Sequence, residues 1–355
     1  MSLRDIFSKA LSQWMRGTGA ESDIVIGSRV RLARNLTGVA FPSVADDEQK
    51  KYVMKQAKGA LEQMQGALGD VEFVPMAEVS PLERQILVER HLISPDLTRD
   101  VKHKGVILRS DEAVSVMVNE EDHFRIQALF PGLALSEAWE LCSQVDDAFD
   151  RVVSFAYSPR YGYLTACPTN VGTGMRASIM VHLPALTISD QIKRVIGAIG
   201  QVGLAVRGIY GEGTEVLGNI YQISNQITLG HSEEEIIDHL RNVTMKVLEQ
   251  ERSAREHLLQ RGRLQLEDRV YRSYGILANA RSMTSHEAMQ RLSDLRLGID
   301  LGLVKGIEPR ILQELLVMIR PAHLQKIMGE ELDPPRRDER RAALIRERLR
   351  TAGKA

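Results

Sequence analysis

The segment AVSVMVNEEDHFRIQALF, residues 113–130, holds two alternating stretches on either side of a charged cluster. AVSVMV (113–118) and FRIQALF (124–130) both show the period of two that is typical of a half-buried strand. Between them stand three consecutive acids and a histidine, residues 120–123. Neighbouring carboxylates repel one another, and a buried carboxylate is costly unless a cation pairs with it. The segment therefore predicts two strands of a sheet joined by an acidic cluster that binds a cation.

Strand-like stretches continue on both sides of this segment. GVILRS and AVSVMVN (105–119) flank Asp111-Glu112, which is a hairpin signal. Strands joined by short turns favour an antiparallel sheet, and helical patterns between them favour an α+β fold with helices packed on a large sheet. The other expected strands are 23–34, 161–166, 176–183, 203–210 and 217–226, and the expected helices are 46–64, 80–93 and 136–152, of which the last two begin at a capping serine.

Beyond His231 the chain shows only helical patterns. Residues 233–260 carry apolar side chains at 236, 240, 243 and 247, a heptad-like stripe that makes a dimer through helices plausible. We therefore expect two domains, a catalytic α+β domain over 1–258 and a helical dimerisation or regulatory domain over 259–355.

The composition limits the classes of function. The chain has 355 residues and a formal net charge of −1, so no overall field favours nucleic acid or an anionic membrane. Two cysteines, Cys142 and Cys167, form neither a disulfide framework nor a metal-ligand spacing. No apolar run is long enough for a signal peptide or a membrane helix. These features predict a cytoplasmic protein without a bound structural metal.

Nucleotide-binding loops of the GxxxxGK[ST] and GxGxxG types are missing, so any phosphate must be bound by side chains. Arg29 and Arg31 are two apart on an expected strand and share a face. Each arginine alone is more often a solvated surface charge, but several around one site would clamp a polyphosphate. Arg125, Arg176 and Arg207 also fall on or beside expected strands.

Two further positions can be interpreted either as ordinary structural residues or as functional residues. Glu212 lies between two glycines in RGIYGEGTE (207–215), either as a solvated loop acid or as a carboxylate that reaches a substrate. Cys167 opens the turn-rich stretch CPTNVGTG, either as a small core residue or as a thiolate beside guanidinium groups.

Four blocks together resemble the phosphagen (guanidino) kinases. They are SRVRLAR (28–34), NEEDHFRI (119–126), CPTNVGTGMRAS (167–178) and RGIYGEGTE…IYQISNQ (207–226), and they stand in that family's order over roughly residues 20–255. The resemblance implies an enzyme that transfers a phosphoryl group from ATP, with Mg²⁺, to a guanidinium nitrogen. The family's helical N-terminal domain has no counterpart here, and a helical C-terminal region is added.

The same resemblance implies roles for individual residues. Glu121 and Glu212 would be the paired carboxylates that hold the guanidinium, and Cys167 would lie beside it. Apart from the resemblance, an alternating strand cannot aim all three acids inward, so Glu120 and Asp122 either pair with arginines and hold the shape of the site or contact the substrate directly, and His123 is read as structural. Met180 stands where the family has a nucleotide-contacting histidine, which leaves the adenine pocket less defined than the phosphate clamp. The residues that would bind ATP are Arg29, Arg31, His91, Arg125, Arg176 and Arg207.

Without a covering N-terminal domain the site would admit an arginine that is still part of a protein. This fits the bacterial branch of the family that phosphorylates arginine in proteins and marks them for a Clp protease in stress response. For that branch, RDERRA (337–342) resembles an allosteric phosphoarginine-binding motif, here Arg337, Asp338 and Arg341. Its implied partners are a Clp ATPase, an activator protein and a heat-shock repressor, with a homodimer or higher homo-oligomer. A kinase for free arginine or another small guanidine, and a phosphoarginine-binding adaptor, are the alternatives.

Overall fold

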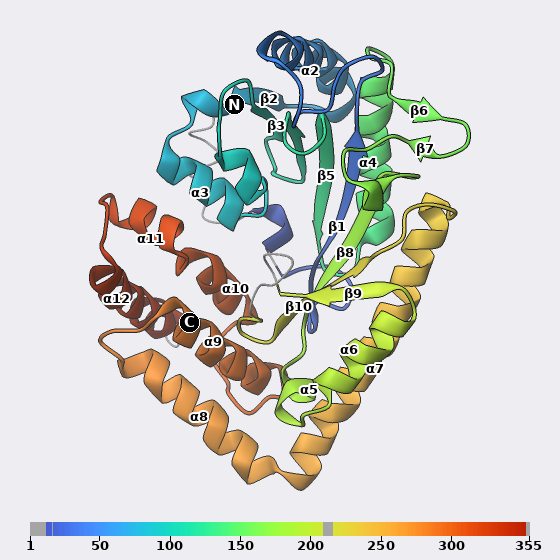
Figure 1. Ribbon diagram of the computed structural model, residues 1–355. Helices are drawn as coiled ribbons and strands as arrows, with labels where there is room; N and C mark the ends of the chain where they lie inside the picture. The colour runs from blue at the N-terminus through green and yellow to red at the C-terminus, as the bar shows by residue number, and fades with distance from the viewer. Residues whose placement is uncertain (1–11, 16, 209–215, 353–355) are drawn as a thin grey trace.

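The computed structural model describes residues 12–15, 17–208 and 216–352. Within these ranges, eight strands form one antiparallel sheet in the order β2-β3-β4-β5-β1-β8-β10-β9, and a two-stranded hairpin, β6-β7, projects beyond it (Figure 1). The strands are β1 (Val25–Arg34), β2 (Val71–Pro75), β3 (Gly105–Arg109), β4 (Val114–Val118), β5 (Phe124–Pro131), β6 (Tyr157–Ser158), β7 (Gly162–Tyr163), β8 (Met175–His182), β9 (Leu204–Arg207) and β10 (Ile220–Asn225).

Helices cover the sheet and continue beyond it as a separate layer at the C-terminal end. No helix in the described ranges is long and apolar enough to cross a membrane. The helices are α2 (Asp47–Leu68), α3 (Pro81–Glu89), α4 (Leu135–Asp150), α5 (Pro184–Ile188), α6 (Ile192–Gln201), α7 (Glu233–Arg261), α8 (Arg263–Asn279), α9 (Ser285–Asp300), α10 (Pro309–Met318), α11 (Pro321–Met328) and α12 (Pro334–Ala352).

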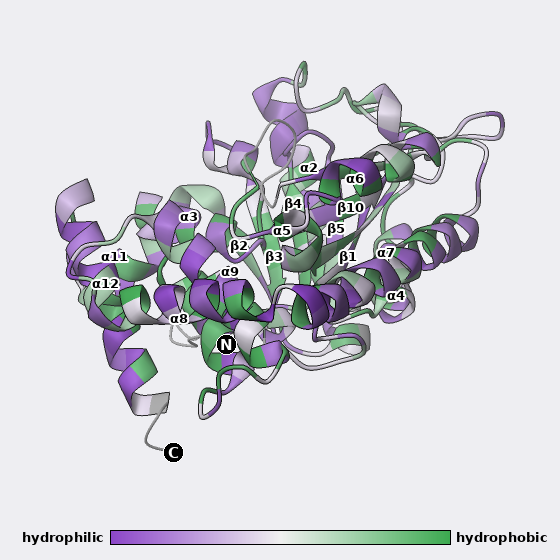
Figure 2. Ribbon diagram, turned by 90° about the horizontal axis from the view of Figure 1, so that it is seen from below, coloured by the Kyte–Doolittle hydropathy of each residue, from purple (hydrophilic) through white to green (hydrophobic). Residues whose placement is uncertain are grey.

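Alternation along β1 separates an apolar face from a polar face. Val30 and Leu32 are fully buried in a core formed with α2, α4 and α7. Arg29 and Arg31 point to the opposite face, because successive side chains of a strand alternate. In Figure 2 the central strands are largely green, whereas α7 shows a mostly purple outer surface. The α+β fold that the sequence predicts is therefore confirmed.

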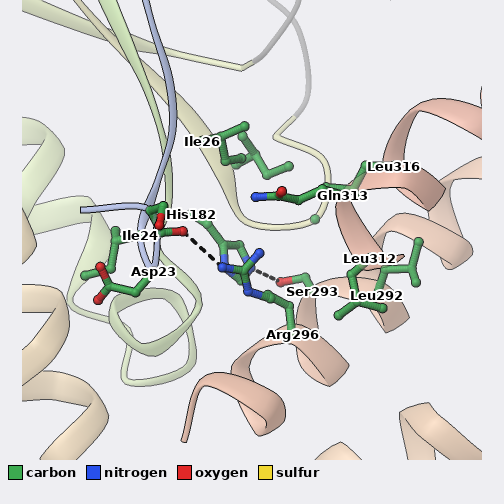
Figure 3. Close-up of a pocket in the computed structure, with 13 residues that line it drawn as sticks. Asp23, Ile24, Ile26, His182, Leu292, Ser293, Arg296, Leu312, Gln313 and Leu316 are labelled. Carbon is green, nitrogen blue, oxygen red and sulfur yellow. Dashed lines mark hydrogen bonds between the residues drawn. The ribbon is translucent and has the colours of Figure 1, made fainter. Parts of the chain in front are cut away.

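The C-terminal helices dock on the lower part of the polar face, where the sheet residues become apolar again. Leu129, Met180 and Ile220 join a second buried cluster with residues of α8, α9, α10 and α12. Polar contacts also cross this boundary (Figure 3). The Ser293 hydroxyl lies 2.8 Å from His182 Nε2 and accepts a 2.7 Å hydrogen bond from Asn219 Nδ2. The helical layer is thus fixed to the sheet by both apolar packing and a buried hydrogen-bond network.

Several local expectations need correction. α4 begins at Leu135, and its N-cap Ala134 makes no side-chain hydrogen bond, so Ser136 is not the cap. Within 161–166, strand structure covers only Gly162–Tyr163, because the following residues turn away to form the loop that carries Cys167. The edge strand β2 was not expected from the sequence.

The heptad-like stripe also has a different use. Ile236, Leu240 and Val247 are buried in the chain's own core, where α7 packs on β8 and β10. The stripe therefore gives no support for a dimer, and the oligomeric state stays a prediction. α7 continues through residue 258 to Arg261, and the domain division at 258/259 also stays a prediction.

Candidate active site

Strand register brings all five expected phosphate-clamp arginines onto the polar face of the sheet. Arg31 of β1 lies directly opposite Arg176 of β8. Arg125 of β5 lies opposite Ala33, which is two residues after Arg31 on β1 and therefore on the same face. Arg207 at the end of β9 pairs with Gln222 of β10, which accepts a 3.0 Å hydrogen bond from Arg29 Nη2.

These side chains line one cleft of about 1150 Å³. Eight of the nine expected catalytic and ATP-binding residues lie around it, and the ninth, Glu212, lies outside the described residues. The structure therefore brings these eight together, although the role of each stays a proposal. The cleft is lined by Arg29, Arg31, Val88, His91, Ile93, Ser94, Pro95, Met117, Glu121, Arg125, Gln127, Cys167, Thr169, Asn170, Arg176, Arg207 and Gln222.

The cleft is strongly electropositive at its floor. Burial, together with the neighbouring charge of Arg125, lowers the pKa of Arg29 to about 10. Burial and the charges of Arg29, Arg125 and Arg176 hold the pKa of Arg31 well below its usual value, against a smaller opposing effect of Glu120. The buried Nε atoms of Arg29 and Arg31 have no hydrogen-bond partner within the described chain. Cations crowded in this way favour an anionic ligand.

The acidic cluster divides into two supporting residues and one that faces the cleft. Glu120 accepts a 2.8 Å bond from Arg125 Nη1 and another from the Ser94 hydroxyl. Asp122 accepts 2.7 Å bonds from Asn35 Nδ2 and from the backbone N–H of Ala166, so it fixes the loop before Cys167. Both residues therefore shape the site, as the sequence analysis expects.

Glu121 is the member of the cluster that lines the cleft. Burial raises the pKa of Glu121, and the charges of Asp122 and Glu120 add to this effect, while Arg125 opposes it. A carboxylate in such surroundings gains from a cationic partner and accepts a proton more readily than an exposed glutamate.

His123 is structural in its contacts. The ring is fully buried, with Nδ1 accepting a 3.0 Å bond from the backbone N–H of Leu36 and Nε2 lying 2.8 Å from Ala40 O. It joins the acidic cluster to the segment that follows β1.

Cys167 also lines the cleft. Its Sγ lies 3.1 Å from Thr169 Oγ1, and its carbonyl oxygen accepts a 2.8 Å bond from the Thr165 hydroxyl. The Thr228 hydroxyl donates to both Thr169 O and Val171 O. These bonds hold the thiol at a defined place on the wall of the cleft.

His91 closes the end of the cleft next to the C-terminal helices. It has a φ of +60°, and its ring meets the Trp14 ring edge to face at 5.4 Å. Burial and the nearby charges of Arg29 and Arg320 lower the pKa of His91 to about 3, so the ring is neutral at pH 7. Met180 lines an adjoining apolar pocket of about 480 Å³ together with His91 and Gln313.

Gln127 is one of the lining residues that the sequence analysis did not include. Gln127 stands two residues after Arg125 on β5 and donates a 2.7 Å hydrogen bond to His91 O. The two-residue alternation that selects Arg29 and Arg31 also places Gln127 on this face, and it was the available signal.

The tail motif lies away from this cleft, on α12. Arg341 is 2% exposed and donates to Ile319 O at 2.9 Å and to Met283 O at 2.8 Å. It also pairs with Asp338, while Arg337 is half-buried one helical turn away. Arg341 thus connects α12 to the junction between α10 and α11, and its phosphoarginine-binding role stays a proposal.

Comparisons with known proteins agree with the class of fold and site. Residues 52–254 match the family "ATP:guanido phosphotransferase, C-terminal catalytic domain". A taurocyamine kinase from Schistosoma mansoni with bound transition-state analogue components is 27% identical with a TM-score of 0.60, over 70% of this chain and 35% of that one. A lombricine kinase structure shares the fold, at 24% identity and a TM-score of 0.58 over 70% of each chain. The fold is that of a guanidino phosphotransferase.

The remaining matches extend over almost the whole chain. Residues 263–355 match the "Protein-arginine kinase McsB C-terminal domain". The protein-arginine kinase of Halalkalibacterium halodurans is 54% identical over 350 residues, covering 99% of this chain and 98% of that protein. Those of Bacillus licheniformis and Moorella thermoacetica are also 54% identical, covering 99% and 95% of this chain and 96% and 97% of theirs. The chain therefore belongs to the protein-arginine kinase family of ATP:guanido phosphotransferases.

Proposed function

We propose that this protein transfers the γ-phosphoryl group of ATP to a guanidinium nitrogen of arginine side chains in proteins. The observation that carries the proposal is the one cleft that Glu121 lines together with five partly buried arginines. Cys167 lines the same cleft. A flat cation and a polyanion can therefore be bound side by side, which is what transfer from ATP to a guanidinium requires.

The arginines would bind the triphosphate. Arg29, Arg31 and Arg176 project from adjacent strands, so their positions are fixed by the sheet rather than by mobile loops. Guanidinium groups bind phosphate oxygens through paired hydrogen bonds and offset the charge that spreads over the transferred group. Bound Mg²⁺ would supply further neutralisation of the phosphates.

Glu121 would orient the substrate guanidinium and receive its proton. The guanidinium has a pKa of about 13.8, so the attacking nitrogen must lose a proton as it attacks phosphorus. The nitrogen–phosphorus bond forms as the bond to the β-phosphate oxygen breaks, and ADP leaves. Because its pKa is raised, Glu121 would accept the proton of the attacking nitrogen more readily than an ordinary glutamate. Glu212, by family resemblance, would be the second carboxylate, and Cys167 would contact the guanidinium from its own side.

The test compares Glu121→Gln with Glu256→Gln, an exposed glutamate on α7 that serves as the control. Each full-length variant is incubated with ATP and Mg²⁺ and either an arginine-rich protein or free arginine. Transfer is measured by intact mass at neutral pH, because the nitrogen–phosphorus bond is acid-labile. We expect the control to phosphorylate the protein and Glu121→Gln to lose at least a hundredfold in rate. Undiminished transfer by Glu121→Gln would overturn the assignment, and transfer to free arginine alone would favour the small-molecule kinase.

The wider biological role is proposed from the family resemblance. The phosphorylated proteins would be marked for a Clp ATPase and its protease in the cytoplasm during stress. An activator protein and a heat-shock repressor would be further partners. Arg337, Asp338 and Arg341 would bind phosphoarginine and regulate the enzyme, and the protein would act as a homodimer or higher homo-oligomer.

A further inference from the structure

A second hollow lies on the other side of the loop that carries Cys167. It has an open volume of about 1140 Å³ and is formed by the β6-β7 hairpin, the end of α4 and the start of α7 (Figure 1). We call it the tyrosine hollow. It is lined by Asp150, Phe155, Tyr157, Arg160, Tyr161, Gly162, Tyr163, Gly172, Thr173, Thr228, Leu229, Gly230, His231 and Glu233.

The hollow exposes aromatic and apolar side chains that contribute nothing to the core. Tyr157 is 60% exposed, Tyr161 43% and Leu229 50%. Tyr157 is held by an edge-to-face contact with the Tyr163 ring at 5.3 Å. Exposed tyrosines on a fixed scaffold are typical of binding surfaces, because they offer a large contact area at a low cost in conformational entropy.

Two tyrosine rings of the hollow already stack with guanidinium groups of the protein itself. The Arg34 guanidinium carbon lies 3.4 Å from the centre of the Tyr163 ring, and that of Arg160 lies 5.0 Å from the centre of the Tyr161 ring. Such stacking over an aromatic face is favourable for a cation. The geometry therefore suits further arginine or lysine side chains of a partner.

The charges of the hollow point in the same direction. Asp150 and Glu233 lie at its rim, at the end of α4 and the start of α7. Burial raises the pKa of Tyr163, and the nearby charge of Arg34 opposes this effect. The carboxylates Asp146, Asp150 and Glu233 also raise the pKa of Tyr163. Arg160 and His231 also line the hollow, so the carboxylates outnumber the permanent cations there.

The position of the hollow links it to the proposed substrate. Cys167, Thr169 and Asn170 line the active-site cleft, whereas Gly172 and Thr173 line the hollow. One short loop thus separates the two spaces. The loop is thin and tightly packed at Gly172. A Cβ atom added to Gly172 would lie only 2.3 Å from Thr228 O, so a larger residue does not fit at this position.

We propose that the tyrosine hollow docks the polypeptide segment that flanks the target arginine, with a preference for basic residues in that segment. The inference rests on the proposed protein-arginine kinase function and identifies how a protein, as opposed to a free amino acid, would be recognised. The active-site cleft would hold the reacting guanidinium, and the hollow would add affinity for the chain around it.

The test uses Tyr157→Ser/Tyr161→Ser and a control, Tyr52→Ser, which removes a 49% exposed tyrosine from α2. Each full-length enzyme is assayed with two peptides that contain one arginine. One is a capped tripeptide, and the other is about twenty residues long with lysines around the arginine. For the double variant we expect about a tenfold higher KM for the long peptide, unchanged kcat and an unchanged KM for the tripeptide. Tyr52→Ser should match the wild type.

A second variant tests the charge. Asp150→Asn/Glu233→Gln should raise the KM of the lysine-flanked peptide severalfold and leave that of a serine-flanked peptide unchanged. An unchanged KM for the long peptide in both double variants would overturn the proposal. An equal rise in KM for the long peptide and the tripeptide would overturn it too, since the residues would then act on the cleft itself. Failure of the wild-type enzyme on every peptide would refute the underlying kinase function instead.

Discussion

The buried ion pair between Arg90 and Glu112 predicts a large loss of stability when one partner is removed. Arg90 Nη1 and Glu112 Oε1 are 2.6 Å apart, with side chains 2% and 1% exposed. Glu112 also accepts a hydrogen bond from Ser12, and Arg90 Nε lies 3.0 Å from His323 Nε2 of α11. Glu112→Ala would leave a guanidinium buried without its carboxylate, which costs about 3–5 kcal/mol of unfolding free energy.

The chain offers a control pair with the same distance and the opposite exposure. Lys51 Nζ and Glu48 Oε1 are also 2.6 Å apart, but their side chains are 53% and 82% exposed. Glu48→Ala should cost far less than Glu112→Ala, because water screens the pair and solvates the remaining charge. The comparison therefore separates the effect of burial from the effect of distance.

Urea unfolding of the full chain, followed by tryptophan fluorescence, measures both variants. A third variant, Arg90→Met/Glu112→Leu, removes both charges and should recover a large part of the loss caused by Glu112→Ala. The interpretation fails if Glu112→Ala and Glu48→Ala lower the free energy of unfolding equally. It also fails if the double variant is less stable than Glu112→Ala.

Two further predictions concern the cleft. Burial raises the pKa of Glu121, and its carboxylate must be ionised to accept a proton. In a pH–rate profile, kcat/KM should therefore fall as the pH drops through a pKa above the ordinary glutamate value of 4.5. A fall that begins only at or below pH 4.5 would contradict the assignment. Arg31→Lys should lower kcat/KM for ATP about a hundredfold, because a lysine cannot bind two phosphate oxygens in a fork, whereas Arg241→Lys on the exposed face of α7 should change it less than twofold. Equal effects of the two lysine substitutions would remove Arg31 from the clamp.

Local patterns in the sequence were sufficient for most strands and for the acidic cluster. The alternation in 23–34 and 124–130 corresponds to β1 and β5, and the hairpin signal at Asp111-Glu112 joins β3 to β4. These elements depend on side-chain periodicity and turn chemistry, both of which are local. The contacts of Glu112 were not visible in this way, because its partner Arg90 comes from α3 and meets it only in the folded chain.

Strand order was the part that local patterns could not supply. Arg29 and Arg31 share a face by spacing alone, but their meeting with Arg125 and Arg176 requires β1 to lie between β5 and β8. β5 and β8 are separated by more than forty residues that include α4 and the β6-β7 hairpin. The stripe on α7 failed as a dimer signal for the same reason, since a heptad-like pattern does not reveal whether its partner is another chain or the chain's own sheet.

The surroundings of the arginines distinguish those that stabilise the fold from those available to a ligand. Arg34 is 1% exposed and fully engaged with Asp146, Ala33 O and Thr173 O. Arg31 is only partly buried, yet its buried Nε has no partner within the described chain and the charges of three other arginines surround it. Folding alone gains nothing from such an arrangement, because buried like charges lower stability. The arrangement suits the proposed ligands, because a triphosphate would neutralise the arginines and a guanidinium would pair with Glu121.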